Sequence, residues 1–411
     1  MRQIVSSLFV LGGLGCAATF LSASTLSQPA APEPVRYAMD VATVSGMGAM
    51  AGGGGLGSMM NMMRGGPPEA VRLLTLHHGA GTTAPKPRAD HFMPQGADLG
   101  ESLPLLPLPR GKVDADPSFE RPSGRLLLFW GCGASAPKGQ PVVIDFAKVA
   151  AGVMPPGLLK GGVDLPEDWQ LSVSTAQTYT TWPNGKDGKA VTVRGSLVGA
   201  HRVTANYAKE ISFNLVEDFM PPLQAATSNA AGGASQLAWK GLGKATGYYA
   251  WAIGSRDMGR GDAPTEMVWW ASSKDQAFGG PLWDWISPAG VRKLIAAGTV
   301  MPPEQRDCII PAEVIKASGE GMMVNLQAFG PQADFTYPPR PADARSPWNP
   351  EWIARVRFRS STMLIPGMEG MAQGTGQPDT SASGMGAEAK PRKPKCKGLK
   401  GLAERAAGLC E

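Results

Sequence analysis

Residues 235–273 constrain the fold of this chain more than any other stretch, because large aromatic side chains alternate there with a period of two. Tyr249, Trp251 and Ile253 fall on one face of an extended strand, and the intervening small or aromatic residues fall on the other. The alternation returns at Trp269 after a turn rich in Gly, Asp and Pro. Aromatic residues at this spacing favour a pleated, half-buried sheet, so the ordered part of the chain is predicted to be a β structure.

Short β-prone runs occur along the rest of the central region, and turn residues separate them, notably Pro-Asn-Gly at 183–185. In the last run, apolar residues alternate with arginines. The runs are residues 124–133, 140–146, 169–175, 189–195, 210–216, 322–329 and 351–365. This spacing of strands and turns predicts antiparallel sandwiches.

An early Trp239, a Gly-Tyr-Tyr strand and a Trp-rich strand resemble, over some 40 residues, the opening of an immunoglobulin-like or fibronectin-III sandwich. The chain then departs from that pattern. Ser287 is a good N-cap, Pro288 suits the first helical position, and Gly298 supplies a stop, so a short helix is expected at 287–298.

The predicted fold class is therefore mainly β, with two antiparallel β-sandwich units and a short helix inserted in the second. Long Gly/Pro-rich tracts flank these units, and their backbone entropy disfavours order. The expected divisions are a signal peptide (1–24), a Gly/Met/Pro-rich disordered arm (25–118), a first unit (119–223), a linker (224–234), a second unit (235–366) and a disordered basic tail (367–411).

The N-terminus has the pattern of an export signal. Arg2 precedes an apolar run at 4–14 that is too short to span a bilayer, and small residues allow cleavage before Thr25. Cys16 offers an alternative as a lipoprotein anchor, although Gly13 stands where such a motif has Leu. The predicted location is periplasmic or secreted, with an outer-membrane lipoprotein as the alternative and no transmembrane segment in the mature chain.

Removal of a signal peptide leaves four cysteines, an even number that suits an oxidising compartment. Cys396 and Cys410 lie close in sequence and are expected to pair. Cys132 and Cys308 then either pair with each other or stay buried as thiols.

The formal charge of +5 is concentrated at the C-terminus, because residues 386–411 hold seven Lys/Arg and three Glu. The rest of the chain is nearly neutral, which argues against a nucleic-acid partner. A solvated tail is the simplest interpretation of the basic segment, and contact with an acidic surface is the alternative.

Common catalytic signatures, including GxSxG, HExxH and phosphate-binding glycine loops, are absent from the sequence. Acidic groups at Asp164, Glu167 and Asp168 and at Glu217 and Asp218 leave a secreted hydrolase as a third hypothesis. Such an enzyme needs two carboxylates facing each other across a cleft. The chain is predicted not to be an enzyme.

Exposed aromatic and cationic side chains on a sheet are typical of ligand platforms. Four tryptophans fall within seventeen residues, and three arginines alternate in the last strand. The candidate ligand-binding residues are Trp269, Trp270, Trp283, Trp285, Arg355, Arg357 and Arg359. The alternatives are core packing for the tryptophans and a solvated face on an edge strand for the arginines. As a site, the arginines would suit an anionic polymer or a lipid headgroup.

Thioether and imidazole groups in the N-terminal arm suggest an alternative function, because they are suitable ligands for copper. In composition only, the arm resembles metal-binding tracts of periplasmic copper-handling proteins. The candidate ligands are Met47, Met50, Met59, Met60, Met62, Met63, His77, His78 and His91. Their irregular spacing defines no ligand set, and a low-complexity linker explains the methionines equally well.

The sequence thus predicts an exported, non-enzymatic binding or cell-envelope protein without a cofactor. An envelope protein or a polysaccharide is the expected class of partner. Periplasmic copper binding and secreted hydrolysis are the competing hypotheses, and neither the ligand nor the oligomeric state follows from the sequence.

Overall fold

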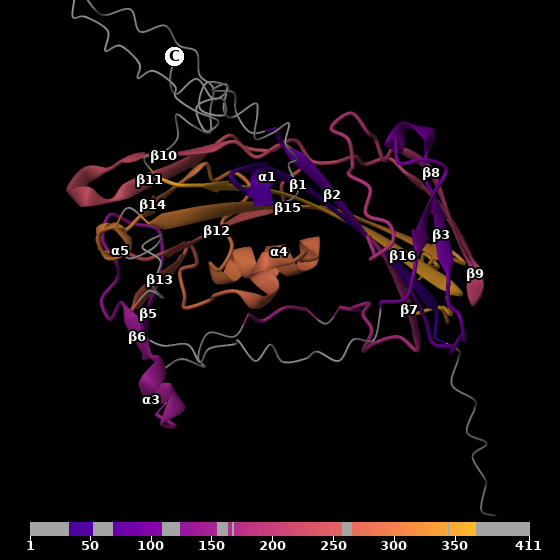
Figure 1. Cartoon of the computed structure of the whole chain (residues 1–411), viewed down its shortest axis with the longest axis horizontal. Coiled ribbons are helices and arrows are strands. Elements are labelled where there is room, and N and C mark those ends of the chain that lie inside the picture. Colours follow the sequence, from indigo (N-terminus) through magenta and orange to yellow (C-terminus); the bar gives the residue numbers. More distant parts are fainter. Residues whose placement is uncertain are drawn as a thin grey trace, which may run out of the picture. The chain divides into compact units, whose positions relative to one another are not determined.

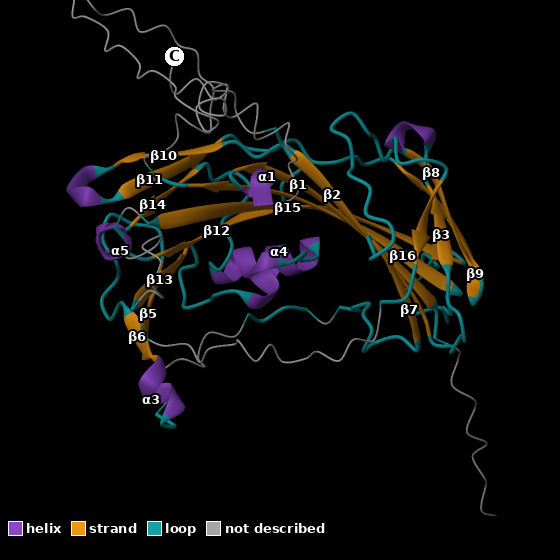
Figure 2. Cartoon of the chain, in the orientation of Figure 1, coloured by secondary structure: helices purple, strands orange, loops and turns teal. Residues whose placement is uncertain are grey.

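Strand β12 (Gly247–Gly254), which contains the alternating aromatic residues, lies inside a nine-stranded sheet in the computed structural model of the protein. The structure describes residues 33–51, 69–108, 124–153, 163–166, 168–256, 265–319, 321–343 and 345–366. All of these residues belong to one compact unit. The described part of the chain is mainly β and forms several sheets (Figure 2).

The nine-stranded sheet is mixed, since β13 pairs with β5 and β1 pairs with β16 in parallel, whereas the other neighbours are antiparallel. In spatial order its strands are β6 (Val142–Asp145), β5 (Arg125–Trp130), β13 (Glu266–Ala271), β12, β15 (Met322–Tyr337), β16 (Trp352–Leu364), β1 (Val35–Gly46), β2 (Val71–Ala80) and β7 (Thr178–Trp182). The long strands β15, β16 and β1 form its middle (Figure 1).

Two smaller sheets accompany the large one. One contains β10 (Ala225–Asn229), β11 (Ser235–Trp239) and β14 (Asp307–Ile310), and the other contains β4 (Ser102–Leu105), β3 (Ala89–Phe92), β8 (Gly199–Ala205) and β9 (Ala208–Leu215). The described helices are α1 (Gly48–Ala51), α3 (Phe146–Ala150), α4 (Pro288–Ala297) and α5 (Ala312–Ser318), with 3-10 turns η1 (Gln95–Ala97), η2 (Ala231–Gly233) and η3 (Gly280–Trp283).

The two faces of the nine-stranded sheet pack against different partners. On one face, Tyr248 belongs to a large apolar core that also holds Leu237 from β11 and Ile211 from β9. On the other face, Tyr249 packs in a smaller core with Val291 from α4. This confirms the predicted alternation of β12, because the neighbouring side chains Tyr248 and Tyr249 pack in different cores on opposite faces of the sheet.

Helix α4 begins and ends where the sequence predicts. The Ser287 hydroxyl accepts a hydrogen bond from the backbone N–H of Gly290, and Pro288 occupies the first turn. Gly298 ends the helix at a φ of 77°, a conformation that glycine adopts without strain. The buried side of α4 covers the middle of the nine-stranded sheet (Figure 1), so this helix defines one border of the candidate site.

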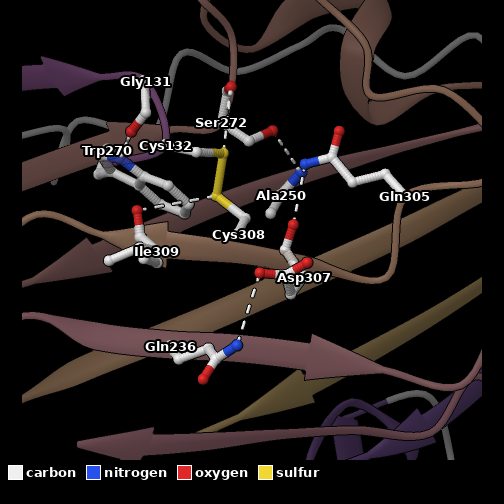
Figure 3. Close-up of a disulfide and its surroundings, with 10 residues drawn as sticks. All are labelled: Gly131, Cys132, Gln236, Ala250, Trp270, Ser272, Gln305, Asp307, Cys308 and Ile309. Atoms are coloured by element: carbon white, nitrogen blue, oxygen red, sulfur yellow. Dashed lines mark hydrogen bonds between the residues drawn. A yellow bond between two sulfur atoms is a disulfide. The ribbon is translucent and has the colours of Figure 1, made fainter. Parts of the chain in front are cut away.

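A disulfide between Cys132 and Cys308 joins the loop that follows β5 to strand β14 (Figure 3). It therefore links the nine-stranded sheet to the three-stranded sheet, and it joins two residues that are 176 positions apart in the sequence. Closing a loop of this length stabilises the fold by roughly 2–5 kcal/mol, through the restricted unfolded chain. The sequence left open whether Cys132 and Cys308 form a disulfide or stay as buried thiols, and in the structure they form the disulfide.

The described part of the N-terminal region differs from the disordered arm expected at 25–118. It supplies β1 and β2 to the nine-stranded sheet, and β3 and β4 to the four-stranded sheet. Met39 and Val41 of β1 are almost fully buried, and β1 pairs on one side with β16, far away in sequence. The composition of one segment carries no information about a pairing partner so far away in sequence. The glycines at 52–57 also dominate the average composition of this region, which therefore suggested disorder.

The division into two units with a linker also differs from the structure. The nine-stranded sheet combines β5 and β6, from the expected first unit, with β12, β13, β15 and β16, from the expected second unit. The expected linker at 224–234 contains β10.

Several predictions lie outside the described residues: the signal peptide (1–24), Cys16, the tail (367–411) and the proposed Cys396–Cys410 pair. Within the described ranges, no helix has the length and apolar character needed to cross a membrane.

Candidate functional site

Tryptophan and arginine side chains gather on the face of the nine-stranded sheet that α4 borders. We call this set the aromatic–arginine strip: Trp169, Trp251, Trp269, Trp283, Trp285, Arg355, Arg357 and Arg359. Strands β12, β13 and β16 supply five of these residues, whereas Trp283 and Trp285 belong to η3 and the loop that follows it. Because side chains alternate along a strand, β16 presents its arginines on this face and its apolar residues to the large core.

Three indoles form one end of the strip, with Trp283 stacked on Trp269 and tilted against Trp251. The ring centroid of Trp283 lies 5.1 Å from that of Trp251 and 5.2 Å from that of Trp269. Trp283 nevertheless remains 38% exposed, while the other two are half-buried. Gly279, with a φ of 58°, lies against this stack, where an added Cβ would come within 3.2 Å of Trp269. The close approach of this glycine lets the η3 turn place Trp283 over the sheet.

Arg359 joins the indoles to the arginine row. Its guanidinium carbon lies 3.7 Å from the ring centroid of Trp285, and its Nη1 donates a hydrogen bond to the Trp283 carbonyl oxygen at 2.6 Å. Among the described residues, no carboxylate lies within 4.0 Å of this guanidinium, and its Nε is buried without a hydrogen-bond partner. Burial lowers the pKa of Arg359 from its ordinary value, although the nearby charge of Asp284 opposes that shift.

The other two arginines are paired with carboxylates. Arg355 donates to both oxygens of Asp168, at 2.9 and 2.7 Å, and its Nε donates to Asp334 at 3.2 Å. Arg357 donates to both oxygens of Asp40, at 2.7 and 2.8 Å. Bidentate pairs of this kind fix the guanidinium plane, so these arginines are held rigidly and their charge is balanced.

The Asp40 carboxylate is the most buried charged group of this face, with only 4% of the residue exposed. Burial alone would raise its pKa, but hydrogen bonds from His77 and Arg357 and their charges hold the pKa below its ordinary value. The Nε2 of His77 lies 3.5 Å from Asp40, and the Tyr179 hydroxyl lies 2.6 Å from the Nδ1 of His77. Burial raises the pKa of Tyr179, so its phenol stays protonated.

The structure brings six of the seven predicted ligand residues together and separates Trp270 from them. Trp270 is fully buried in the large core, and its Nε1 donates a hydrogen bond to the Gly131 carbonyl oxygen at 2.9 Å (Figure 3). The solvated edge-strand interpretation of the arginines is wrong, because β16 lies between β15 and β1 and Arg355 is buried.

Sequence reasoning did not include Trp251, Trp169 or Asp40 in the site. The period of two placed Trp251 on the same face of its strand as Ile253, and the pairing of Ile253 with Trp269 brings Trp269 to that face. Trp169 stacks at 4.2 Å on Arg355, and Asp40 binds Arg357, through contacts between segments far apart in sequence. No local pattern reports such contacts.

The histidines proposed as metal ligands do not converge. His77 and His78 are neighbours in β2, so they point to opposite faces, and His91 uses both ring nitrogens in hydrogen bonds. Within the described ranges, no group of three His, Cys, Asp or Glu is placed to hold a metal ion. Met47 is half-buried beside α1, and nothing is described for the Met50 side chain; Met59, Met60, Met62 and Met63 lie outside the described residues. The copper hypothesis stays a prediction about that segment.

A buried chain of hydrogen bonds crosses between the nine-stranded and four-stranded sheets. His201 Nε2 lies 2.7 Å from the Leu197 carbonyl oxygen, which only accepts, so this nitrogen carries the hydrogen. Its Nδ1 then accepts from His91 Nε2 at 2.9 Å, and His91 Nδ1 accepts from the Tyr37 hydroxyl at 2.6 Å. Burial lowers the pKa of both histidines, so the chain is held in one neutral tautomeric state.

The carboxylates considered for hydrolysis have other partners. Asp168 binds Arg355, and Asp218 accepts hydrogen bonds from the Ser196 hydroxyl at 2.7 Å and the Leu197 backbone N–H at 3.1 Å. Glu217 forms an ion pair with Lys244. Asp164 forms an ion pair with Lys293 at 2.7 Å, and Glu167 lies outside the described residues.

The aromatic–arginine strip is therefore the best-supported candidate site among the described residues. It combines one exposed indole, several half-buried ones and arginines whose positions are fixed by stacking and ion pairs. No protein-family model, no curated protein and no solved structure matches this chain.

Proposed function

We propose that the protein is an exported, non-enzymatic binding protein of the cell envelope, and that the aromatic–arginine strip holds its ligand. The observation that carries this proposal is the position of Trp283. Its indole contacts the rings of two further tryptophans, yet 38% of the residue stays exposed. An indole that is held rigidly and still meets solvent offers a large contact area at little further entropic cost.

The disulfide supports the proposed location. Bridges of this kind form and persist mainly in oxidising compartments and are rare in the cytosol. The Cys132–Cys308 bridge joins two sheets of the core, so its formation is part of folding. Together with the export signal expected at 1–24, it favours a periplasmic or secreted protein.

The strip is also better suited to binding than to chemistry. The buried carboxylate beside it, Asp40, is engaged by Arg357 and His77, and Arg355 engages Asp168. A general acid or base needs a proton that it can exchange with a substrate near neutral pH. The lowered pKa of Asp40 and the raised pKa of Tyr179 move both groups away from that range.

A sedimentation assay tests this function. Purified mature protein is mixed with washed, insoluble cell-envelope material, and the fraction that pellets is measured against protein concentration. We expect saturable pelleting of the wild type and at least a tenfold weaker apparent affinity for Trp283→Ala, since a tryptophan that anchors a ligand can contribute more than about 1.4 kcal/mol to binding.

Tyr337→Ala is the matched control. Tyr337 is another exposed aromatic residue, 53% exposed and stacked at 6.2 Å on Trp352, but it lies outside the strip. This variant should pellet as the wild type does. Equal pelleting of wild type and Trp283→Ala, with both variants folded by circular dichroism, would refute the proposed role of the strip.

A further inference from the structure

The charge balance of the strip restricts the kind of ligand that it can hold. The guanidinium groups of Arg355 and Arg357 already direct their paired hydrogen bonds to Asp168, Asp334 and Asp40. An anionic group would have to displace these carboxylates, two of which make bidentate contacts. Arg355 and Arg357 are therefore neutralised by the protein's own carboxylates, which leaves these two arginines poorly suited to an anionic polymer or a lipid headgroup.

Polar atoms remain available beside the exposed indole. Asp284, which follows Trp283 directly, is exposed, and its Oδ1 accepts a hydrogen bond from the backbone N–H of Trp285 at 2.7 Å. Its Oδ2 has no protein partner among the described residues. The half-buried Arg359 guanidinium donates from its Nη1 to the Trp283 carbonyl oxygen at 2.6 Å. An indole face is thus flanked by one acceptor and one donor of opposite charge.

We propose that this surface binds a neutral glycan, an inference that rests on the proposed function of the strip. The apolar C–H face of a sugar ring stacks on the Trp283 indole. One hydroxyl donates to Asp284 Oδ2, and a neighbouring hydroxyl oxygen accepts from the Arg359 guanidinium. Vicinal hydroxyls supply both a donor and an acceptor without a net charge, which matches the acceptor and donor that the strip leaves open.

The same groups disfavour acidic glycans. A uronate or sulfate placed on Trp283 would meet the unpaired oxygen of Asp284, and its attraction to Arg359 would be offset by that repulsion. A neutral sugar avoids this conflict. Its binding should also depend little on ionic strength, because no net charge is neutralised on binding.

Affinity electrophoresis of the full mature chain tests the inference. Native gels are cast with neutral glycans (a glucan, a mannan and a galactan) or with acidic ones (polygalacturonate and alginate), each at low and at high salt. We expect at least one neutral glycan to retard the wild type equally at both salt concentrations. Neither acidic polymer should retard it.

Three variants distinguish the contacts. Trp283→Ala should weaken retardation at least tenfold, and Tyr337→Ala should leave it unchanged. Asp284→Asn is the sharpest, since it removes the charge and keeps the size. A neutral glycan should bind this variant several-fold more weakly, because a hydrogen bond to a charged group is stronger than one to an amide. An acidic ligand should bind it more tightly, because a repulsive charge has gone.

Salt-sensitive retardation by an acidic polymer that Asp284→Asn strengthens would overturn the inference. So would the absence of retardation by every neutral glycan. In either case, pelleting with envelope material that depends on Trp283 would leave the proposed function standing. Loss of both the retardation and the Trp283-dependent pelleting would remove the proposed function as well.

Discussion

At the scale of single residues, the described part of this protein contains histidines whose protonation states are fixed by burial. His78 and His91 are fully buried, and His201 is nearly so. Burial lowers the pKa of His78 to about 3, and it also lowers the pKa of the other two. Each imidazole is therefore neutral in the folded protein and gains a proton more easily when the chain unfolds.

This difference predicts a loss of stability in mild acid. A histidine titrates near pH 6.5 when unfolded, so below that pH the unfolded state binds more protons and the free energy of unfolding falls. At pH 5 the loss should be roughly 2 kcal/mol for each histidine that stays neutral in the fold. Urea unfolding at several pH values measures it. A free energy of unfolding that does not change between pH 7 and pH 5 would contradict the conclusion that the buried histidines are neutral in the folded protein.

The Asp40–Arg357 pair makes a second prediction at this scale. Arg357→Leu removes both hydrogen bonds from a carboxylate of which the side chain is only 5% exposed. Leaving that buried charge with His77 as its remaining partner should lower the free energy of unfolding by about 3 kcal/mol. The double variant Asp40→Asn/Arg357→Leu should recover part of this loss, as chemical denaturation would show. Additive effects of the two single changes would mean that the pair is not coupled.

At the scale of secondary-structure elements, patterns that lie within one segment were predictable and long-range pairings were not. The alternations of β12 and β16 and the caps of α4 were correct, because each is contained in a few neighbouring residues. Residues 169–175 and 189–195 were expected as strands but form turns and irregular chain. Residues of high β propensity form a strand only where another strand is available to pair with them. Strand β1 was missed because the strand that pairs with it, β16, is far away in sequence.

The role of β1 predicts the effect of one substitution. Val41→Pro places a proline opposite Phe358 and Leu74, in a strand paired on both sides, where it removes a ladder hydrogen bond. We expect a loss of more than about 3 kcal/mol of unfolding free energy, or failure to fold, measured by thermal or urea denaturation. Glu33→Pro, at an exposed residue before β1, is the control and should be neutral. Wild-type stability of Val41→Pro would restore the disordered-arm interpretation.

At the scale of the whole molecule, the candidate site exists because one sheet unites distant parts of the chain. The strip draws on Trp169, on strands β12 and β13, on η3 with the loop after it, and on the arginines of β16. Sequence analysis found six of these side chains by residue type and period. It could not anticipate the carboxylates that neutralise two arginines, because Asp40 and Asp168 reach them through tertiary pairing.

Oxidative footprinting of the tryptophans measures most directly whether a ligand covers the strip. The mature protein is exposed to hydroxyl radicals with and without washed cell-envelope material, and modification is quantified for each residue by mass spectrometry. We predict that the ligand protects Trp283, the most exposed residue of the indole stack, while Tyr337, which is also exposed but lies outside the strip, is modified equally in both samples. Unchanged oxidation of Trp283 under conditions where the protein binds the material would contradict the proposal that the strip is the binding site.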